Sequence, residues 1–283
     1  MNNGEQKIEV IEDPRRVLKR YGLKPKYTWG QNFLISRGAI EKIARACVDK
    51  PGRKVIEIGA GLGTLTSAIL QLGGRVIAVE RDREMCRVLR SEFEHLANFA
   101  LEEADAKKYD YQTALSDEPG VIAGNLPYQL TGPIIRRITD IDAPMIRAVI
   151  MVQREVAERI LAGPGEKGRS AFSVMVQARV TPKIIHRLSP SAFHPKPKVD
   201  SAVLSLEPLR QSIFDGDVPR KVFDRVVKAA FSSRRKTIKN SMLSSQLAPR
   251  EHIEDMLSKA GIDPQIRAER LTIQNFYTIC QFL

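Results

Sequence analysis

Short β-rich runs alternate with helical segments through most of the chain, and this alternation is the strongest constraint on the fold. The β-rich runs lie at 54–58 (KVIEI), 75–79 (RVIAV), 121–124 (VIAG), 148–152 (AVIMV) and 203–206 (VLSL). Helical periodicity occupies 37–49, 64–72 and 83–96. Strands that alternate with helices form parallel βαβ units, so the sequence predicts an α/β fold with an open sheet.

The pattern changes after residue 207. A polar, turn-rich connector follows, and beyond it the chain has only helical periodicity. We therefore expect two domains in the 283 residues. The first is an α/β domain over 1–207, of which 1–24 is an N-terminal extension, and the second is a small all-helical domain over 208–283.

The net positive charge per residue is about twice as high in the helical domain as in the rest of the chain. The whole chain has 45 Lys and Arg against 33 Asp and Glu, a net charge of +12, and residues 208–283 contribute 13 against 8. The densest point is Arg234-Arg235-Lys236, with Lys239 one turn further on. Such a run is either a solvated helix face or a patch that contacts the phosphates of a nucleic acid.

Several classes of protein are disfavoured by what the sequence lacks. Cys47, Cys86 and Cys280 form no CxxC pair and are odd in number, and the four histidines are scattered. Neither a zinc cluster nor a disulfide framework is therefore expected, and the thiols fit a reducing cytosol. The polar first twenty residues lack the apolar core of a signal peptide, and no run is long enough to span a membrane. We expect a cytoplasmic protein without a metal or a membrane partner.

A glycine-rich loop, Glu57-Ile-Gly59-Ala-Gly61-Leu-Gly63, joins the first strand to the helix at 64–72. Glycines at such a turn let the backbone approach a ligand closely. A dinucleotide fingerprint, GxGxxG, needs its third glycine where Thr64 stands, and a phosphate-binding Walker loop needs Gly-Lys-Ser/Thr. The loop therefore fits a nucleoside or an amino-acid group better than a pyrophosphate.

Two acidic residues follow the loop at positions suited to a nucleoside. Glu80 ends the second strand, where a carboxylate can accept hydrogen bonds from both hydroxyls of a ribose. Asp105 comes later, within reach of an adenine amino group. The alternative is a structural glycine turn with surface acids. Taken together, the loop and the acids predict a site for S-adenosylmethionine, a ligand that has an adenosine and no phosphate.

The strand candidate at 121–124 (VIAG) runs directly into Asn125-Leu126-Pro127-Tyr128. The amino group of adenine is a poor nucleophile, because its lone pair is delocalised into the ring. The Asn125 side-chain oxygen and the Leu126 carbonyl could accept its hydrogens and free the lone pair. Tyr128 could stack on a base that has swung out of its helix. Positioning and electrostatics would then produce the rate, with no general base and no metal.

Two flanking segments complete the candidate site. Gly30-Gln31-Asn32-Phe33-Leu34 precedes the first helix, and its amides could reach the methionine end of the cofactor, or Phe33 could simply anchor a helix-entry loop. Phe193-His-Pro195-Lys-Pro197 is a rigid loop. Phe193 could form the second wall around a target base, or it could be a buried anchor.

These motifs make the sequence resemble the small-subunit ribosomal RNA adenine dimethylase family, from about Lys24 to the C-terminus. The motifs occur in the family's order: Gln31-Asn-Phe-Leu34, Glu57-x-Gly-x-Gly61, Glu80, Asp105, Asn125-Leu-Pro-Tyr128, Phe193-x-Pro-x-Pro197 and Arg234-Arg-Lys-Thr237. The resemblance implies a Rossmann-like methyltransferase domain followed by a helical domain that docks on ribosomal RNA. It implies contacts to S-adenosylmethionine from Gln31, Asn32, Leu34, Gly59, Gly61, Glu80, Asp105 and Asn125. It further implies that Asn125, Tyr128 and Phe193 hold the target base.

By this resemblance the chain dimethylates N6 of two adjacent adenines near the 3′ end of 16S rRNA, in the assembling 30S subunit. The expected partner is therefore 16S rRNA in the 30S subunit or its precursor, and the expected state is a monomer. Two alternatives remain at this stage. One is the antibiotic-resistance methylase of large-subunit rRNA, which shares the Asn-x-Pro-Tyr and Gln-Asn-Phe-Leu motifs. The other is a nucleic-acid-binding relative that has lost the chemistry.

Overall fold

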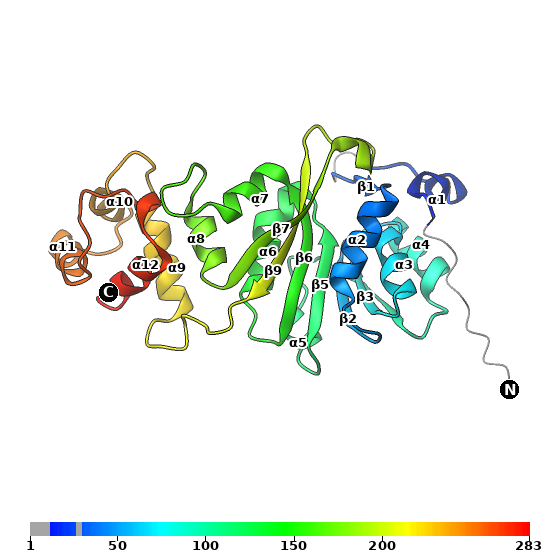
Figure 1. Cartoon of the computed structure of the whole chain (residues 1–283), viewed down its shortest axis with the longest axis horizontal. Coiled ribbons are helices and arrows are strands. Elements are labelled where there is room, and N and C mark those ends of the chain that lie inside the picture. Colours follow the sequence, from blue (N-terminus) through cyan, green and yellow to red (C-terminus); the bar gives the residue numbers. More distant parts are fainter. Residues whose placement is uncertain (1–11, 27–29) are drawn as a thin grey trace. The chain divides into compact units, whose positions relative to one another are not determined.

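The α/β part is built on a seven-stranded sheet with the strand order β4-β3-β2-β5-β6-β9-β7 (Figure 1). The computed structural model describes residues 12–26 and 30–283, without the side chain of Tyr128. The strands of the sheet are β2 (Lys54–Ile58), β3 (Arg75–Glu80), β4 (Phe99–Glu103), β5 (Gly120–Asn125), β6 (Met145–Gln153), β7 (Val180–Leu188) and β9 (Ser201–Pro208). Neighbouring strands from β4 to β6 are parallel, and β9 is antiparallel to β6. The predicted α/β class is confirmed.

Helices cover both faces of this sheet. The helices are α1 (Pro14–Arg20), α2 (Arg37–Cys47), α3 (Thr64–Gln71), α4 (Arg83–Phe93), α5 (Tyr111–Ala114), α6 (Thr131–Thr139) and α7 (Arg154–Leu161), with the short 3₁₀ helix η2 (Tyr128–Leu130) before α6. Alternate residues of β5 and β6, such as Val121 and Val149, pack with Ile40 and Ile69 of α2 and α3. Helix α6 lies behind the sheet in Figure 1, on the opposite face.

All five apolar runs predicted as strands are strands, and their bounds differ from the predicted ones by at most three residues. Strands β4 and β7 have no counterpart in the sequence prediction. They are the two edges of the sheet, and most of their residues are only partly buried or exposed. An edge strand has no continuous apolar run to reveal it, and β7 also contains Pro182, which is compatible with an edge position.

The turn from β2 into α3 shows why this loop is rich in glycine. Gly59, Gly61 and Gly63 have φ angles of 67°, 58° and 77°, the left-handed region that side chains disfavour. A Cβ on Gly63 would lie 2.2 Å from the Phe93 ring of α4. The glycines therefore allow a sharp turn and let α3 pack closely on its neighbour.

The chain divides into two compact units. The first contains residues 1–157 and 183–207, and the second contains residues 158–182 and 208–283. The predicted first domain, 1–207, included residues 158–182, whereas these residues pack with the helical tail. The β-strand pair β1 (Phe33–Leu34) and β8 (Phe193–His194), with the 3₁₀ helix η3 (Pro190–Ala192), belongs to the first unit.

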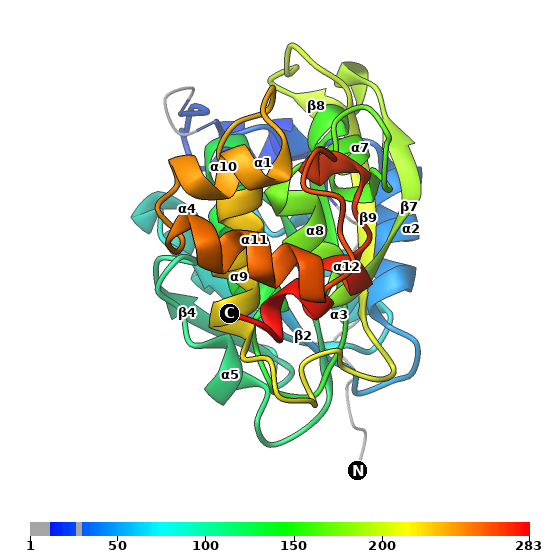
Figure 2. The same cartoon turned by 90° about the vertical axis from the view of Figure 1, so that its left-hand side faces the viewer.

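The second unit is helical and has its own core (Figure 2). Its elements are α8 (Ala171–Gln177), α9 (Arg220–Ala230), α10 (Ile238–Ser244), α11 (Arg250–Lys259), η4 (Ala268–Arg270) and α12 (Ile273–Cys280). Helix α9 contacts α8, α10 and α12, and its Phe223 and Val227 are fully buried. A buried ion pair at 3.1 Å joins Arg179 after α8 to Asp224 of α9. Because residues near 179 supply this partner, the helical unit needs the earlier segment as well as the tail.

Within residues 12–26 and 30–283, no helix is both long enough and apolar enough to cross a bilayer.

Candidate functional site

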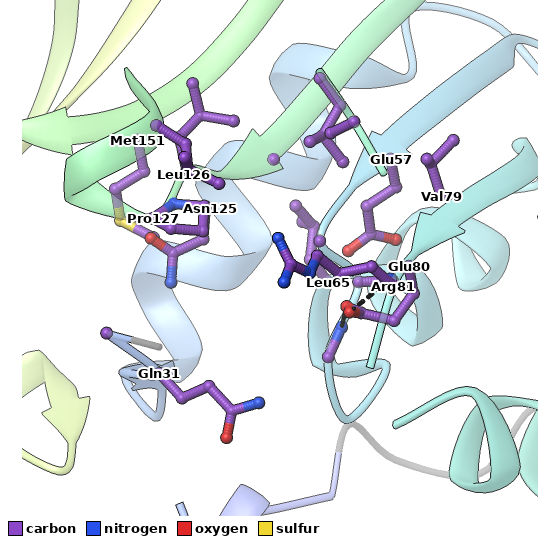
Figure 3. A pocket seen from close by; sticks show the side chains of 18 of the residues that line it. Gln31, Glu57, Leu65, Val79, Glu80, Arg81, Asn125, Leu126, Pro127 and Met151 are labelled. Carbon is purple, nitrogen blue, oxygen red and sulfur yellow. Dashed lines mark hydrogen bonds between the residues drawn. The ribbon is translucent and has the colours of Figure 1, made fainter. Parts of the chain in front are cut away.

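A cavity of about 360 Å³ lies in the first unit, where β2, β3 and β5 end at their carboxyl edge (Figure 3). The carboxyl edge of a parallel sheet is where ligands bind in open α/β folds. Every residue predicted to bind the cofactor lines this cavity, namely Gln31, Asn32, Leu34, Gly59, Gly61, Glu80, Asp105 and Asn125, and so does Leu126. The structure therefore brings together residues that are far apart in the sequence.

Glu80 is held rigidly at the end of β3. One carboxylate oxygen accepts a hydrogen bond from the Gly61 backbone N–H at 3.0 Å, and the other accepts from the backbone N–H of Arg81 at 2.8 Å (Figure 3). The second oxygen also accepts from the backbone N–H of Asp82 at 2.9 Å. Burial raises the pKa of Glu80, although these three amides act in the opposite direction. The carboxylate is thus tied to the glycine loop and fixed in place before any ligand arrives.

Glu57, the acid that opens the glycine motif, is a second carboxyl group on the cavity wall. It is 2% exposed and accepts a 2.6 Å hydrogen bond from the Thr66 hydroxyl of α3. Burial, with help from the nearby charge of Glu80, raises the pKa of Glu57 to about 8. A cation bound in the cavity would favour the ionised form of this group.

Asp105 follows β4 on the same side of the cavity. Its carboxylate accepts a hydrogen bond from the Lys107 backbone N–H at 2.9 Å, which fixes the turn. The guanidinium of Arg81 lies 3.9 Å from the second oxygen of Asp105. Glu57, Glu80 and Asp105 therefore give the cavity wall three carboxyl groups, an arrangement suited to a positively charged ligand.

Asn125 ends β5 at the mouth of the cavity, beside Met151 of the neighbouring strand β6 (Figure 3). Its side-chain Nδ2 donates a 2.8 Å hydrogen bond to the backbone carbonyl of Asn32. Because Nδ2 is bonded to the Asn32 carbonyl, the assignment of Oδ1 is fixed, and Oδ1 is the atom of this amide that can accept a hydrogen bond. The backbone N–H of Leu126 bonds to the Met151 carbonyl at 3.2 Å, so the turn that carries both residues is attached to the sheet.

Of the two aromatic residues predicted to hold a base, the structure describes the side chain of Phe193 but not that of Tyr128. The side chain of Tyr128 lies outside the described part, and its backbone begins η2. Phe193 is 1% exposed and packs in the core of the first unit, with its backbone paired to Leu34. Of the two interpretations of Phe193, the structure shows the buried anchor, because the β1–β8 pairing turns this ring into the core.

The segment before α2 has an anchored aromatic ring and also contributes residues to the cavity wall. Phe33 is 9% exposed and packs with Leu62, Met85 and Val88, so it anchors the segment. Gln31, Asn32 and Leu34 face the cavity.

The basic run of the tail is not on a helix. Arg234, Arg235 and Lys236 are exposed in the turn between α9 and α10, while Thr237 begins α10 by accepting a hydrogen bond from the Asn240 backbone N–H. The ammonium group of Lys239 lies 3.4 Å from a carboxylate oxygen of Glu254 on α11. The expectation of a helix face is therefore wrong for the first three cations.

Several lining residues had no role in the sequence prediction, among them Arg81, Met151, Leu65 and Gln129. Asp82 was equally unassigned, yet it is 2% exposed and binds the side chains of Lys26 and Gln31. Its only signal in the sequence is its position two residues after Glu80. Among the described residues, no group of three or more His, Cys, Asp or Glu side chains could hold a metal ion.

A family model described as ribosomal RNA adenine dimethylase matches residues 22–283. The chain belongs to this family. Two relatives, from Anaeromyxobacter dehalogenans (strain 2CP-C) and Myxococcus xanthus (strain DK1622), are each 42% identical to it and are named Ribosomal RNA small subunit methyltransferase A. The alignments cover 92% and 95% of this chain and 94% of each relative.

Solved structures agree with this assignment. A dimethyladenosine transferase from Plasmodium falciparum is 25% identical with a TM-score of 0.74, and the match covers 87% of this chain and 95% of that one. The 23S rRNA methyltransferase ErmE is 24% identical with a TM-score of 0.66, a likeness that concerns the fold alone. The predicted fold class is thus confirmed. The predicted class of enzyme, an S-adenosylmethionine-dependent rRNA adenine dimethyltransferase, is confirmed by the family.

Proposed function

We propose that this protein transfers methyl groups from S-adenosylmethionine to N6 of two adjacent adenines near the 3′ end of 16S rRNA. The observation that carries the proposal is the Asn125 amide, held by the Asn32 carbonyl at the mouth of a cavity with three carboxyl groups. Relatives named for the small subunit, at 42% identity over nearly the whole chain, support this target over the large subunit.

The cavity suits S-adenosylmethionine in size and in charge. Its volume of about 360 Å³ is within the range of small-molecule sites. The carboxyl groups of Glu80 and Asp105 on its wall favour a ligand that is positively charged and rich in hydrogen-bond donors. When bound, this cofactor supplies an electrophilic methyl group.

Named residues account for each part of the cofactor. We assign the ribose hydroxyls to Glu80 and the adenine amino group to Asp105, while Gly59 and Gly61 allow a close approach of the backbone. Gln31, Asn32 and Leu34 are assigned to the methionine end. The amides of Gly61, Arg81 and Asp82 already fix the orientation of Glu80, so its carboxylate is preorganised for the ribose.

Asn125 and Leu126 are assigned to the target amine. Oδ1 of Asn125 and the Leu126 carbonyl would each accept one N6–H, which holds the amino group with its lone pair directed away from the acceptors. Because Nδ2 of Asn125 is bound to the Asn32 carbonyl, the amide cannot turn its nitrogen toward the substrate without losing that bond. The contribution of the protein is orientation in a preorganised site.

Two further assignments concern the RNA. Tyr128 would stack on the flipped adenine, and Phe193 would support this end of the site from within the core. Arg234, Arg235, Lys236 and Lys239 would contact phosphates of 16S rRNA in the 30S subunit or its precursor. With this substrate we expect the reaction to occur in the cytoplasm and the protein to act as a monomer.

The test is the methylation of ribosomal particles. Unmethylated 30S and unmethylated 50S particles are incubated separately with the protein and labelled S-adenosylmethionine. We expect label in the RNA of the 30S particle. Label only in the 50S particle would assign the protein to the antibiotic-resistance type, and label in neither would assign it to the non-catalytic relatives.

A further inference from the structure

A buried carboxylate next to the cofactor cavity has more partners than its structural role requires. Asp82 is 2% exposed and caps α4 by accepting a 3.1 Å hydrogen bond from the Glu84 backbone N–H. The same carboxylate accepts two hydrogen bonds from the Lys26 ammonium, at 2.8 and 2.9 Å, and one from the Gln31 side chain at 2.8 Å. A helix cap needs only the first of these contacts.

Through Lys26 and Gln31, the extra contacts attach the segment before α2 to the turn between β3 and α4. The backbone N–H of Lys26 donates to the Gln31 side-chain oxygen at 2.9 Å, and the Lys26 ammonium also lies 2.6 Å from a carboxylate oxygen of Glu84. Asp82 itself donates its backbone N–H to Glu80. The carboxylate assigned to the ribose and the carboxylate that holds this segment are therefore on one short turn.

The segment held in this way reaches the reacting end of the site. Gln31 is followed directly by Asn32, whose carbonyl accepts the hydrogen bond from Asn125 Nδ2 at 2.8 Å. An unbroken series of contacts thus runs from Asp82 through Gln31 and Asn32 to Asn125. Both Gln31 and Asn32 line the cavity, so the same contacts shape its rim.

The chemistry of the partners makes this contact strong. A carboxylate as buried as Asp82 is unfavourable without a paired charge, and Lys26, with 32% of its side chain exposed, supplies that charge. Charged hydrogen bonds of this length are among the stronger side-chain contacts in proteins. Removing Lys26 leaves a buried carboxylate without its cation, which loosens the segment.

We propose that Lys26 and Asp82 are positioning residues for methyl transfer. They hold residues 30–32 over the cofactor and, through the Asn32 carbonyl, keep the Asn125 amide in its productive orientation. This inference rests on the proposed function, since it assigns these residues to the same reaction. Neither residue contacts the target base in this account, and both act through Gln31 and Asn32.

The test compares Lys26→Met with two reference variants. Lys26→Arg keeps the charge and serves as the conservative rescue, while Lys24→Met removes an exposed lysine from the same segment and serves as the matched control. Two quantities are measured: the Kd for S-adenosylmethionine without RNA, and the single-turnover rate on 30S particles at saturating cofactor. Thermal unfolding reports whether each variant is folded at the assay temperature.

For Lys26→Met we expect about tenfold weaker cofactor binding and an about tenfold slower single-turnover rate, with the protein still folded. Lys26→Arg is expected to recover most of both losses. The inference is overturned if Lys26→Met matches Lys24→Met in both measurements, or if its losses appear only where it unfolds.

A second variant tests whether the two residues act as one contact. Asp82→Asn keeps a good helix cap and removes the charge that binds Lys26. The double variant combines Lys26→Met with Asp82→Asn. If the two residues act through one contact, this variant loses no more cofactor affinity than the worse single variant, whereas additive losses contradict the inference. The cofactor measurement needs no RNA, so it still tests the contact if the wild-type protein labels no particle and the proposed function fails.

Discussion

At the scale of single residues, the site depends on polar groups that are oriented before the ligand arrives. Glu80 has both oxygens bonded to backbone amides, and Asn125 has its nitrogen bonded to the Asn32 carbonyl. Groups fixed in this way do not have to reorganise during the reaction, which is the main source of electrostatic catalysis. In the proposed function, the same rigidity would let the uncharged amide of Asn125 select one amino group.

Glu57 gives a prediction about stability. Its pKa is raised from 4.5 to about 8 in the folded protein. Between these values the unfolded chain releases the proton and the folded chain keeps it, so this group lowers the free energy of unfolding as pH rises, by roughly 1 kcal/mol per pH unit. The effect is absent below pH 4.5 and complete above about pH 8.

The substitution Glu57→Gln removes this titration and keeps an acceptor for the Thr66 hydroxyl. The unfolding midpoint of the cofactor-free variant, measured relative to wild type from pH 4 to pH 9, is therefore expected to rise with pH and then level off. Glu94→Gln removes a carboxyl group at an exposed position and serves as the control for the loss of one charge. If the difference for Glu57→Gln does not change with pH, the raised pKa is contradicted.

At the scale of elements, the sequence predicts the segments with the strongest local patterns. The central strands β2, β5 and β6 are buried, β-rich runs and are predicted from the sequence, as are the periodic helices α2, α3 and α4. The edge strands β4 and β7 are not, because their partly exposed residues follow no apolar pattern.

The candidate site shows the same division. Motif spacing indicates the glycine loop, Glu80 and Asn125, since each stands at the end of a predicted strand. Burial of Phe193 depends on the pairing of β1 with β8, a contact between segments about 160 residues apart that no local pattern reveals. The contact of Lys26 with Asp82 joins residues 56 positions apart, and no local pattern reveals it either.

The turn between α9 and α10 provides the prediction for RNA binding. Arg234, Arg235 and Lys236 are exposed there, so neutralising all three to Gln should weaken binding to 30S particles without changing the Kd for S-adenosylmethionine. If they contact phosphates, the negative slope of log affinity against log salt concentration should become less steep, by about two. Filter binding over a series of salt concentrations measures this slope.

A charge-matched control distinguishes this contact from a general loss of positive charge. Lys42, Arg45 and Lys50 are exposed on the first unit, and their replacement by Gln removes the same net charge. We expect little change in the salt slope for this control. Equal slopes for the two triple variants would assign the effect to net charge and not to the α9–α10 turn.

At the scale of the whole molecule, the proposed function assigns RNA binding and methyl transfer to different parts of the chain. The net charge of +12 is an ordinary signal for nucleic acid, and the tail from residue 208 has the higher share of it per residue. The residues assigned to the cofactor and the target amine all belong to the first unit. Charge would therefore hold the RNA, while an uncharged amide chooses the atom.

The central claim is that Asn125 directs dimethylation of 16S rRNA, and mapping the methyl groups tests it most directly. Unmethylated 30S particles are treated with S-adenosylmethionine and either the wild-type protein or Asn125→Ala, and the 3′ fragment of the RNA is analysed by mass spectrometry. Wild type should place two methyl groups on each of two adjacent adenines, and Asn125→Ala should leave them unmodified while still binding the cofactor. Dimethylation by Asn125→Ala at a rate near wild type, or methyl groups at other sites, would contradict the account.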